Sequence, residues 1–290
     1  MKRDEVRVMA KKKRPSVQAT LPRPRPRGTI IYDNQGRVVV VSGGASGIGS
    51  GIVTGFRDSG AAVVSLDVSH KKNRESAGIL ELQCDVSKEE DCERSVASIA
   101  ERFGGIDVLV NNAAIQPPES YVRPDEVQRE MWERMVAVNL TGYMMLAKHV
   151  LRVMRQQGSG VIVNMASGQA HRTARDVPMY GPLKAANRLQ AMQWGVQYAR
   201  EGIRVVSVSP GAIDTPLVRA SLEQQGGAAN LANRHPLGRL GKPEEVAHAV
   251  MWLSSADAAF ITATDLEVDG GLGGLGSFAD PYPIATVKVP

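Results

Sequence analysis

The feature that most constrains the fold is a buried strand followed by a helix, repeated along the chain from Arg37 onward. Runs rich in Val and Ile, typical of strands buried on both faces of a parallel sheet, lie at residues 38–41, 61–66, 79–84, 108–110, 161–163 and 203–208. Helical patterns separate them, and the longest lie at 131–155, 178–200 and 243–253. Because parallel neighbours need such crossover helices, the alternation predicts an α/β fold with a doubly wound parallel sheet in a single domain.

One helix in this pattern has a predicted start. Ser87 and Glu90 have the spacing of a capping box, in which the two side chains satisfy backbone N–H groups of the first turn. Cys92, Val96 and Ile99 then fall on one helical face. We therefore expect this helix to begin at Ser87 and to cover the sheet with its apolar side.

The basic charge of the chain is concentrated in its first residues. The net charge is +5, but residues 1–27 hold ten Lys and Arg against only Asp4 and Glu5, so the remainder is mildly acidic. We expect 1–36 to be a basic, disordered extension and 37–290 to be the folded domain. The alternatives are that translation starts at Met9, or that the extension is an arm that binds polyanions. Aromatic residues are absent from residues 1–30, so we expect no nucleic-acid partner.

The composition excludes several classes of protein. No uncharged apolar run approaches the roughly 18 residues that cross a bilayer, so we expect no membrane partner. Cys84 and Cys92 are too far apart for a metal-binding pair and fall at apolar positions. We therefore expect buried thiols, no metal site, and a reducing, cytoplasmic location.

A glycine-rich segment follows the first strand and has the sequence Ser42-Gly43-Gly44-Ala45-Ser46-Gly47-Ile48-Gly49. Glycines let the backbone turn sharply and approach a pyrophosphate, and the N-terminus of the next helix supplies free N–H groups. The glycine spacing differs from the general GxGxxG fingerprint. Its place between a buried strand and a helix nevertheless predicts a Rossmann-like dinucleotide site.

The second strand ends at Asp67, where a carboxylate that binds the adenosine ribose is expected. A carboxylate at this point repels a 2′-phosphate. Ser46 and Val68 occupy positions where a basic residue would attract one. The sequence therefore favours NAD over NADP. The alternative is that Asp67 is an ordinary turn residue at the end of a strand.

Tyr180 and Lys184 form a candidate acid/base pair. They are four residues apart, and Pro182 suits the first turn of a helix, so their side chains can share one helical face. Tyr is a poor base at its usual pKa of about 10, and a nearby ammonium favours the phenolate. We therefore expect Lys184 to lower the pKa of Tyr180, although such a pair on its own is more often structural.

Together these motifs resemble those of the short-chain dehydrogenases/reductases over about residues 36–276. They occur in the family's order, which is Ser42 to Gly49, Asn111-Asn112-Ala113-Ala114, Asn139, Ser167, Tyr180-x-x-x-Lys184, and Pro210-Gly211 followed by Thr215. The resemblance implies hydride transfer between a nicotinamide and a secondary alcohol or ketone. It also implies that the chain's own groups fix the geometry and move the proton.

The resemblance implies roles for four catalytic residues. Tyr180 exchanges a proton with the substrate oxygen, and Ser167 hydrogen-bonds that oxygen. Lys184 lowers the pKa of Tyr180 and holds the nicotinamide ribose, and Asn139 holds a water that relays protons. The implied cofactor-binding residues are Gly43, Ser46, Gly47, Ile48, Gly49, Asp67, Asp85, Val86, Asn112, Ala113, Ala114, Tyr180, Lys184, Pro210, Gly211, Ile213 and Thr215.

Four departures from the family pattern leave the catalytic groups in place. They are Ser42 for Thr, Ala114 for Gly, Met165-Ala166 before Ser167, and Leu183 before Lys184.

The substrate is less constrained than the cofactor. Four side chains lie in segments that border the family's pocket and are candidate substrate ligands: Gln116, Gln169, His171 and Arg172. They favour a polar substrate such as a sugar, a polyol or a hydroxy acid. The alternative is that Arg172 and Arg175 are charged loop residues exposed to solvent.

Two further segments have predicted roles. Residues 214–237 interrupt the sheet pattern and contain Gly226 and Gly227, so we expect a mobile lid. The helix at 178–200 is apolar on more than one side and resembles the family's self-association surface. We expect a dimer or a tetramer. The alternative is that this helix is buried wholly within one subunit.

Two classes of function remain in competition. The first is an NAD-dependent oxidoreductase, within which a 3-oxoacyl-type ketoreductase is a rival. The second is a catalytically silent NAD-binding scaffold or sensor. The presence of Asn139, Ser167, Tyr180 and Lys184 favours the enzyme.

Overall fold

The computed structural model describes residues 28–276, and the larger of its two compact units begins at Tyr32. Of the expected extension at 1–36, residues 1–27 lie outside the described residues. Residues 32–36 pack with the domain, since Asn34 is buried and its backbone N–H and Nδ2 donate to the backbone oxygen and Oγ of Ser59, both at 2.8 Å. The folded unit therefore begins earlier than the strand pattern predicts.

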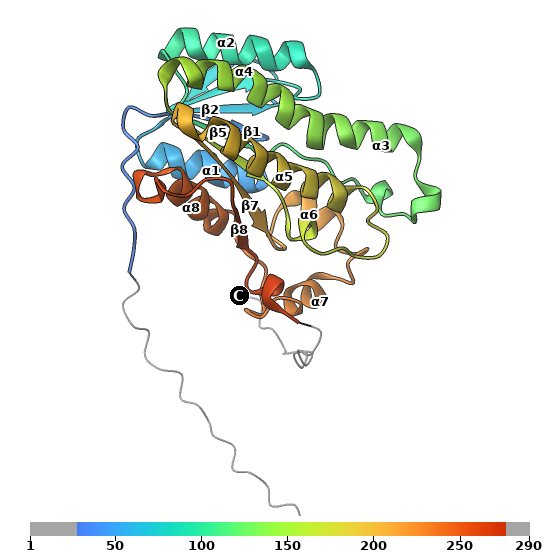
Figure 1. Ribbon diagram of the computed structural model, residues 1–290. Coiled ribbons are helices and arrows are strands. Elements are labelled where there is room, and N and C mark those ends of the chain that lie inside the picture. Colours follow the sequence, from blue (N-terminus) through green and yellow to red (C-terminus); the bar gives the residue numbers. More distant parts are fainter. Residues whose placement is uncertain (1–27, 277–290) are drawn as a thin grey trace, which may run out of the picture. The chain divides into compact units, whose positions relative to one another are not determined.

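The predicted α/β fold is confirmed (Figure 1). Within residues 28–276 one sheet holds eight strands in the order β3-β4-β2-β1-β5-β6-β7-β8. Their bounds are β1 Val38–Ser42, β2 Ala62–Asp67, β3 Arg74–Ser76, β4 Ile79–Gln83, β5 Val108–Asn111, β6 Gly160–Met165, β7 Ile203–Pro210 and β8 Asp265–Val268. The strand order reverses between β1 and β5, and ligands of open α/β sheets bind at the carboxyl ends of strands around such a switch point.

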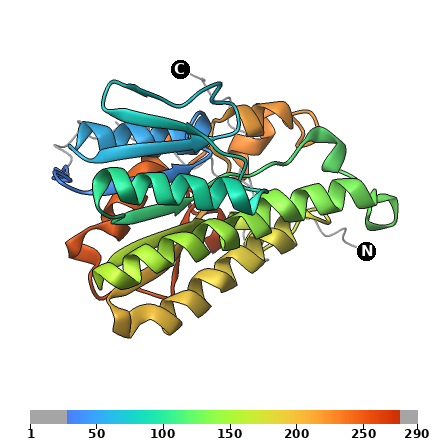
Figure 2. The ribbon, with the colours of Figure 1, turned by 90° about the horizontal axis from the view of Figure 1, so that it is seen from above.

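Helices cover both faces of the sheet. Their bounds are α1 Gly47–Asp58, α2 Glu89–Phe103, α3 Arg129–Val136, α4 Gly142–Gln157, α5 Tyr180–Tyr198, α6 Pro216–Ala220, α7 Ala228–Asn233 and α8 Pro243–Ser254. Helices α2, α4 and α5 lie on one face, and α1 and α8 on the other (Figures 1 and 2).

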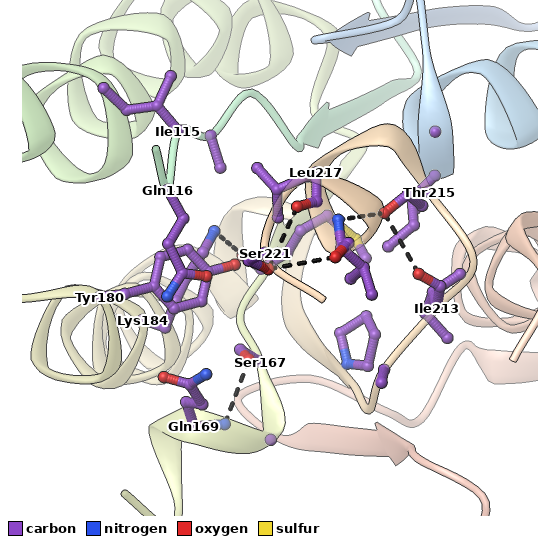
Figure 3. A pocket seen from close by; sticks show the side chains of 18 of the residues that line it. Ile115, Gln116, Ser167, Gln169, Tyr180, Lys184, Ile213, Thr215, Leu217 and Ser221 are labelled. Carbon is purple, nitrogen blue, oxygen red and sulfur yellow. Dashed lines mark hydrogen bonds between the residues drawn. The ribbon is translucent and has the colours of Figure 1, made fainter. Parts of the chain in front are cut away.

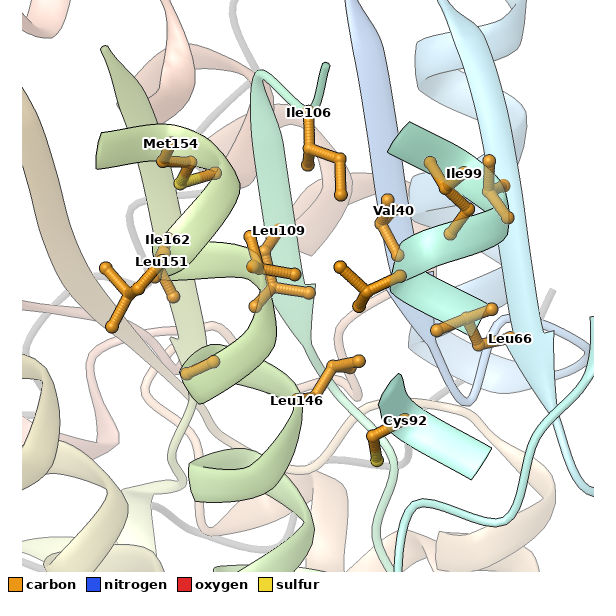
Figure 4. Close-up of a cluster of buried hydrophobic side chains, with 14 of the residues drawn as sticks. Val40, Leu66, Cys92, Ile99, Ile106, Leu109, Leu146, Leu151, Met154 and Ile162 are labelled. Atoms are coloured by element: carbon orange, nitrogen blue, oxygen red, sulfur yellow. The ribbon is translucent and has the colours of Figure 1, made fainter. Parts of the chain in front are cut away.

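Strand β1 shows why the sequence carries unbroken valine runs. Successive side chains of a strand point to opposite faces. Val40 accordingly packs in the cluster under α2 and α4 (Figure 4). Val39 and Val41 pack in the cluster under α1 and α8, with Phe56 and Val250. A strand covered on both faces needs apolar residues at every position.

The long helix predicted at 131–155 is interrupted. Helix α3 ends at Val136, a π-helical turn spans Ala137–Thr141, and α4 begins at Gly142. A π turn shifts the following side chains around the helix axis and is frequent at functional sites. Asn139 lies in the middle of this turn.

Three local features differ from the sequence analysis, although the fold class is confirmed. The helix expected to begin at Ser87 begins at Glu89, and Ser87 Oγ instead donates to Asp85 Oδ1 at 2.7 Å. Strand β8 was not predicted, because the four residues Asp-Leu-Glu-Val are too short to indicate a strand and form one by pairing with β7. Strand β3 runs antiparallel to β4 at the sheet edge, so the sheet is not wholly parallel.

No helix among the described residues is long and apolar enough to cross a membrane.

Candidate active site

The loop from β1 into α1 forms a cradle that requires glycine. Gly43 and Gly47 have φ of +65° and +56°, in the left-handed region that L-residues with a Cβ avoid. A Cβ on Gly49 would overlap the carbonyl oxygen of Gly43. The N-cap Ser46 makes no side-chain hydrogen bond, and the first turn of α1 holds no acidic residue. Its N–H groups and positive helix end therefore suit a phosphate.

A cavity of about 1130 Å³ opens beside this cradle, larger than the ~300–1,000 Å³ typical of small-molecule pockets. Three of the expected catalytic residues line it, namely Ser167, Tyr180 and Lys184. Most of the expected cofactor-binding residues line it as well: Gly43, Ser46, Gly47, Ile48, Asp67, Asp85, Val86, Asn112, Ala113, Ala114, Pro210, Gly211, Ile213 and Thr215. A cavity of this size beside a phosphate cradle fits a dinucleotide.

Three of the expected site residues do not line the cavity. Gly49 lies behind the loop and allows its close approach to Gly43. Asn139 is buried behind the wall. His171, expected as a substrate ligand, instead places Nε2 at 2.8 Å from Asp265 Oδ2, and its side chain is 20% exposed. This pairing joins His171 to a carboxylate on β8, a strand that was not predicted. A role for His171 in binding substrate stays a prediction.

Asp67 stands where a ribose carboxylate is expected. Its Oδ2 accepts from the backbone N–H of Ala45 at 3.1 Å, and its Oδ1 accepts from the backbone N–H of Ser69 at 2.9 Å. These contacts hold the carboxylate against the glycine-rich loop. Among the described cavity residues from this loop and from the ends of β2 and β4, the charged side chains are Asp67 and Asp85.

Asn139 ties the π turn to the loop that follows β5. Its Oδ1 accepts from the backbone N–H of Ile115, and its Nδ2 donates to the Ile115 backbone oxygen, both at 2.8 Å. Its own backbone oxygen accepts from Asn187 Nδ2 at 2.8 Å. The structure thus places Asn139 where it fixes the residue before Gln116. A proton-relaying water on Asn139 stays a prediction.

Ser167, Tyr180 and Lys184 meet at one end of the cavity (Figure 3). Ser167 follows β6, and its Oγ accepts from the backbone N–H of Gln169 at 3.2 Å. Tyr180 is the first residue of α5, and Lys184 lies one turn later. The Lys184 Nζ lies 5.6 Å from the centre of the Tyr180 ring.

The amine of Lys184 is held mainly by groups other than Tyr180. Its Nζ donates to the backbone oxygen of Met165 at 2.8 Å and to the hydroxyl of Tyr143 at 3.1 Å. Burial lowers the pKa of Lys184 to about 7. Burial, followed by the nearby Tyr121, raises the pKa of Tyr180. Lys184 is not among the causes of this shift, and the expectation that Lys184 lowers the pKa of Tyr180 stays a prediction.

This buried amine should make stability depend on pH. The unfolded lysine, with a pKa near 10.5, carries a proton between pH 7 and pH 10 that the folded one lacks. Stability should therefore rise with pH across this window. In Lys184→Met that contribution is absent, so the variant's stability relative to the parent should fall by about 3 kcal/mol between pH 7 and pH 9.5. Urea unfolding curves measure the difference.

The control for this experiment is Lys72→Met, at an exposed lysine. Its stability relative to the parent should stay constant over the same pH range. A constant difference for Lys184→Met would contradict the lowered pKa.

The loop after β7 closes another side of the cavity. Thr215 caps α6, because its Oγ1 accepts from the backbone N–H of Val218 at 3.3 Å. The segment 214–237, expected as a lid, contains α6 and α7 and contributes Leu217, Ser221 and Leu231 to the cavity wall.

Three residues near the site were not identified from the sequence. Tyr143 contacts Lys184, and its place one helical turn after Asn139 was a usable signal. Tyr121 lines the cavity and influences Tyr180. His235 is buried with Nε2 at 3.0 Å from the backbone N of Ala212. Only the fold brings these last two segments to the site.

Comparisons with known proteins agree with this geometry. A family model described as Enoyl-(Acyl carrier protein) reductase matches residues 43–273. The chain is 38% identical over 247 residues to cis-4-hydroxycyclohexanecarboxylate dehydrogenase of Sinomonas cyclohexanicum, which covers 81% of this chain and 96% of that protein.

Two solved structures share the fold over most of their length. Ligand-free aldohexose dehydrogenase of Thermoplasma acidophilum matches with a TM-score of 0.77 and 33% identity, covering 87% of this chain and 98% of that one. The 3-ketoacyl-(acyl-carrier-protein) reductase of Brucella melitensis, complexed with NADH, matches with a TM-score of 0.77 and 30% identity, covering 82% and 99%.

Proposed function

Because this chain is an oxidoreductase of the short-chain dehydrogenase/reductase family, we propose that it interconverts a secondary alcohol and its ketone on a small hydroxylated substrate, with NAD as the hydride carrier. One observation carries the proposal: a single cavity holds the glycine cradle and Asp67 together with Ser167, Tyr180 and Lys184. The silent scaffold is disfavoured because the acid/base groups share that cavity.

The chain's own groups bind the reacting oxygen and supply the proton. A bound nicotinamide supplies or accepts the hydride. The raised pKa of Tyr180 keeps the phenol protonated at neutral pH, which suits it to donate a proton to a carbonyl oxygen. Ser167 Oγ hydrogen-bonds the same oxygen as charge develops on it. In its protonated form the Lys184 amine has three N–H donors, so the two bonds to Met165 and Tyr143 leave one for the nicotinamide ribose.

NAD is proposed over NADP because of the charge around the adenosine end of the cavity. Asp67 and Asp85 line this end, and their negative charge disfavours a 2′-phosphate. The structural relative from Brucella melitensis is described as complexed with NADH. Asp67 would bind the ribose hydroxyls, and the N–H groups of α1 would bind the pyrophosphate.

The proposed substrate is polar, such as a sugar, a polyol or a hydroxy acid. Gln116, Gln169 and Arg172 line the cavity near Tyr180. The relatives include a dehydrogenase of a hydroxycyclohexanecarboxylate and an aldohexose dehydrogenase. Reduction of a 3-ketoacyl thioester is the second candidate activity, because a 3-ketoacyl reductase is among the structural matches. The segment 214–237 is proposed to close over the bound substrate.

The test of this function is a panel of cyclic alcohols, sugars, polyols, hydroxy acids and a 3-oxoacyl thioester, with NAD and NADP in their oxidised and reduced forms. NAD-linked turnover of a hydroxylated small molecule is the expected result. Turnover of the thioester alone would favour the ketoreductase, and binding of NAD without any turnover would favour the scaffold.

Self-association is proposed from an exposed apolar stripe on α5. Leu189 and Val196 are seven residues apart, on one helical face, and are 64% and 75% exposed. Large exposed side chains that share a face mark interaction surfaces. We expect light scattering to give at least twice the chain's mass of 31.1 kDa, as a dimer or a homotetramer. The double variant Leu189→Glu and Val196→Glu should shift this mass downward, and a monomeric parent at micromolar concentration would reject the proposal.

A cytoplasmic location is proposed as well. It is supported by the two free, buried thiols of Cys84 and Cys92, which suit a reducing compartment.

A further inference from the structure

A buried carboxylate on β8 connects the segment that follows Ser167 to the sheet. Asp265 is the first residue of β8, and its side chain is 5% exposed. Its Oδ2 lies 2.8 Å from His171 Nε2, and its Oδ1 accepts from the hydroxyls of Ser207 at 2.5 Å and Ser209 at 3.0 Å. A buried carboxylate is costly unless hydrogen bonds satisfy it. Asp265 therefore joins β7, β8 and the segment after Ser167 at one point.

The same strand makes a second contact with this segment. Asp265 and Glu267 are two residues apart on β8, so their side chains point to the same face of the sheet. Arg172 Nη1 lies 3.7 Å from Glu267 Oε2, but both side chains are more than a third exposed. Exposed ion pairs contribute little to stability. The hydrogen bond between His171 and the buried carboxylate of Asp265 is therefore the main connection.

One short turn leads from His171 to the hydroxyl of Ser167. The backbone N–H of His171 donates to the Gly168 oxygen at 3.2 Å, and that of Ala170 donates to the Ser167 backbone oxygen at 2.8 Å. Ser167 Oγ accepts from the backbone N–H of Gln169 at 3.2 Å (Figure 3). A single turn is unfavourable to form by itself, because it fixes several residues for few bonds. This turn therefore depends on contacts outside itself, and His171 makes one with β8.

We propose that His171 and Asp265 are positioning residues, whose hydrogen bond holds the turn after Ser167 and so places the Ser167 hydroxyl against the substrate oxygen. This inference rests on the proposed function. Neither His171 nor Asp265 is among the described residues that line the cavity, so the effect passes through Ser167. A carboxylate only accepts hydrogen bonds, so the His171 ring donates from Nε2 to Asp265.

The first test removes the donor on the histidine ring. His171→Leu should lower kcat for alcohol oxidation about tenfold, because a displacement of about 1 Å in the site can cost up to about a hundredfold. KM should change by less than about threefold, because an interaction made only in the transition state acts on kcat. Titration with NADH checks that the variant is folded. An unchanged kcat, or a loss confined to KM as for a substrate ligand, would overturn the inference.

Conservative variants assign the loss to this hydrogen bond. His171→Gln keeps an N–H donor for Asp265, so its kcat should lie within about threefold of the parent's. Asp265→Leu removes the acceptor and should lower kcat as His171→Leu does, and the double variant should lose no more than either alone. The control His248→Leu, at an exposed histidine of α8, should keep the parent's kcat. A Gln variant as slow as the Leu variant would overturn the inference.

A double-mutant cycle with Ser167 separates positioning from a general loss of structure. Ser167→Ala alone should lower kcat about a hundredfold, because removal of one donor to a developing oxyanion costs roughly 10²- to 10³-fold. If His171 acts through this hydroxyl, His171→Leu should lower kcat by less than about twofold in the Ser167→Ala background. A further tenfold loss in that background would show that His171 acts on other groups and would overturn the inference.

Amide hydrogen exchange keeps this inference independent of turnover. The backbone N–H groups of Gln169, Ala170 and His171 are hydrogen-bonded within the turn. In His171→Leu they should exchange about tenfold faster than in the parent, and in His171→Gln at about the parent's rate. If the parent oxidises no alcohol, the proposed function fails while exchange still tests the turn. If the parent is active and His171→Leu matches it in exchange and kcat, only the positioning inference fails.

Discussion

Tyr180→Phe is expected to lower kcat for alcohol oxidation about a thousandfold, because a positioned acid or base contributes roughly 10²- to 10⁴-fold. The substitution removes only the hydroxyl, at a residue that lines the cavity beside Ser167 and Lys184. The ring stays, so the packing over Lys184, whose Nζ lies 5.6 Å from the ring centre, is kept. Steady-state kinetics with the best substrate of the panel measure the loss.

Two further measurements make this result specific. Titration with NADH, followed by fluorescence, should give a dissociation constant within about fivefold of the parent's, because one neutral hydrogen bond contributes about 1 kcal/mol or less. Tyr198→Phe, at the opposite end of α5, should keep full activity. If Tyr180→Phe kept more than a tenth of the parent's kcat, another group would have to be the proton donor.

Asp67→Asn is expected to have the next largest effect, on the choice of cofactor. The parent should use NAD with kcat/KM about a hundredfold above that with NADP, because the carboxylate binds ribose hydroxyls and repels a 2′-phosphate. The variant keeps one oxygen, which can accept from the backbone N–H of Ala45 or of Ser69, and loses the charge. Hydrogen bonds to charged groups are worth about 1.5–3 kcal/mol, so the preference for NAD should fall about 10- to 100-fold.

The matched control is Asp58→Asn, at the exposed end of α1. This change raises the net charge by the same amount away from the cavity wall, so it should leave the NAD to NADP ratio unchanged. A parent that prefers NADP, or an unchanged ratio in Asp67→Asn, would show that Asp67 does not select the cofactor.

Much of the fold was predictable because its signals are local. The valine and isoleucine runs mark strands whose residues alternate between two covered faces, as Val39 and Val40 do. The elements missed are those that lack such a signal. Strand β8 is short and half-buried, and its pairing partner β7 lies more than 50 residues earlier in the chain. The π turn around Asn139 changes neither composition nor apolar spacing, so one continuous helix was the natural prediction.

The candidate site was predictable to a similar extent and for a similar reason. The glycine cradle and the Tyr180–Lys184 pair depend on spacing within one loop or one helix, which the sequence displays directly. His171 does not line the cavity, and Asp265, 94 residues away in the chain, holds its ring. Burial, which no spacing reveals, raises the pKa of Tyr180 and lowers that of Lys184.

The sequence by itself determined the alternation of strands and helices, the phosphate loop, the acid/base pair and the family, because each depends on residues close together in the chain. Only the tertiary structure decided what surrounds these groups. It placed Met165 and Tyr143 on the amine of Lys184 and Asp265 on the ring of His171. Solvation and hydrogen-bond partners depend on which distant segments fold against one another, and they set the pKa values and the substrate that the site selects.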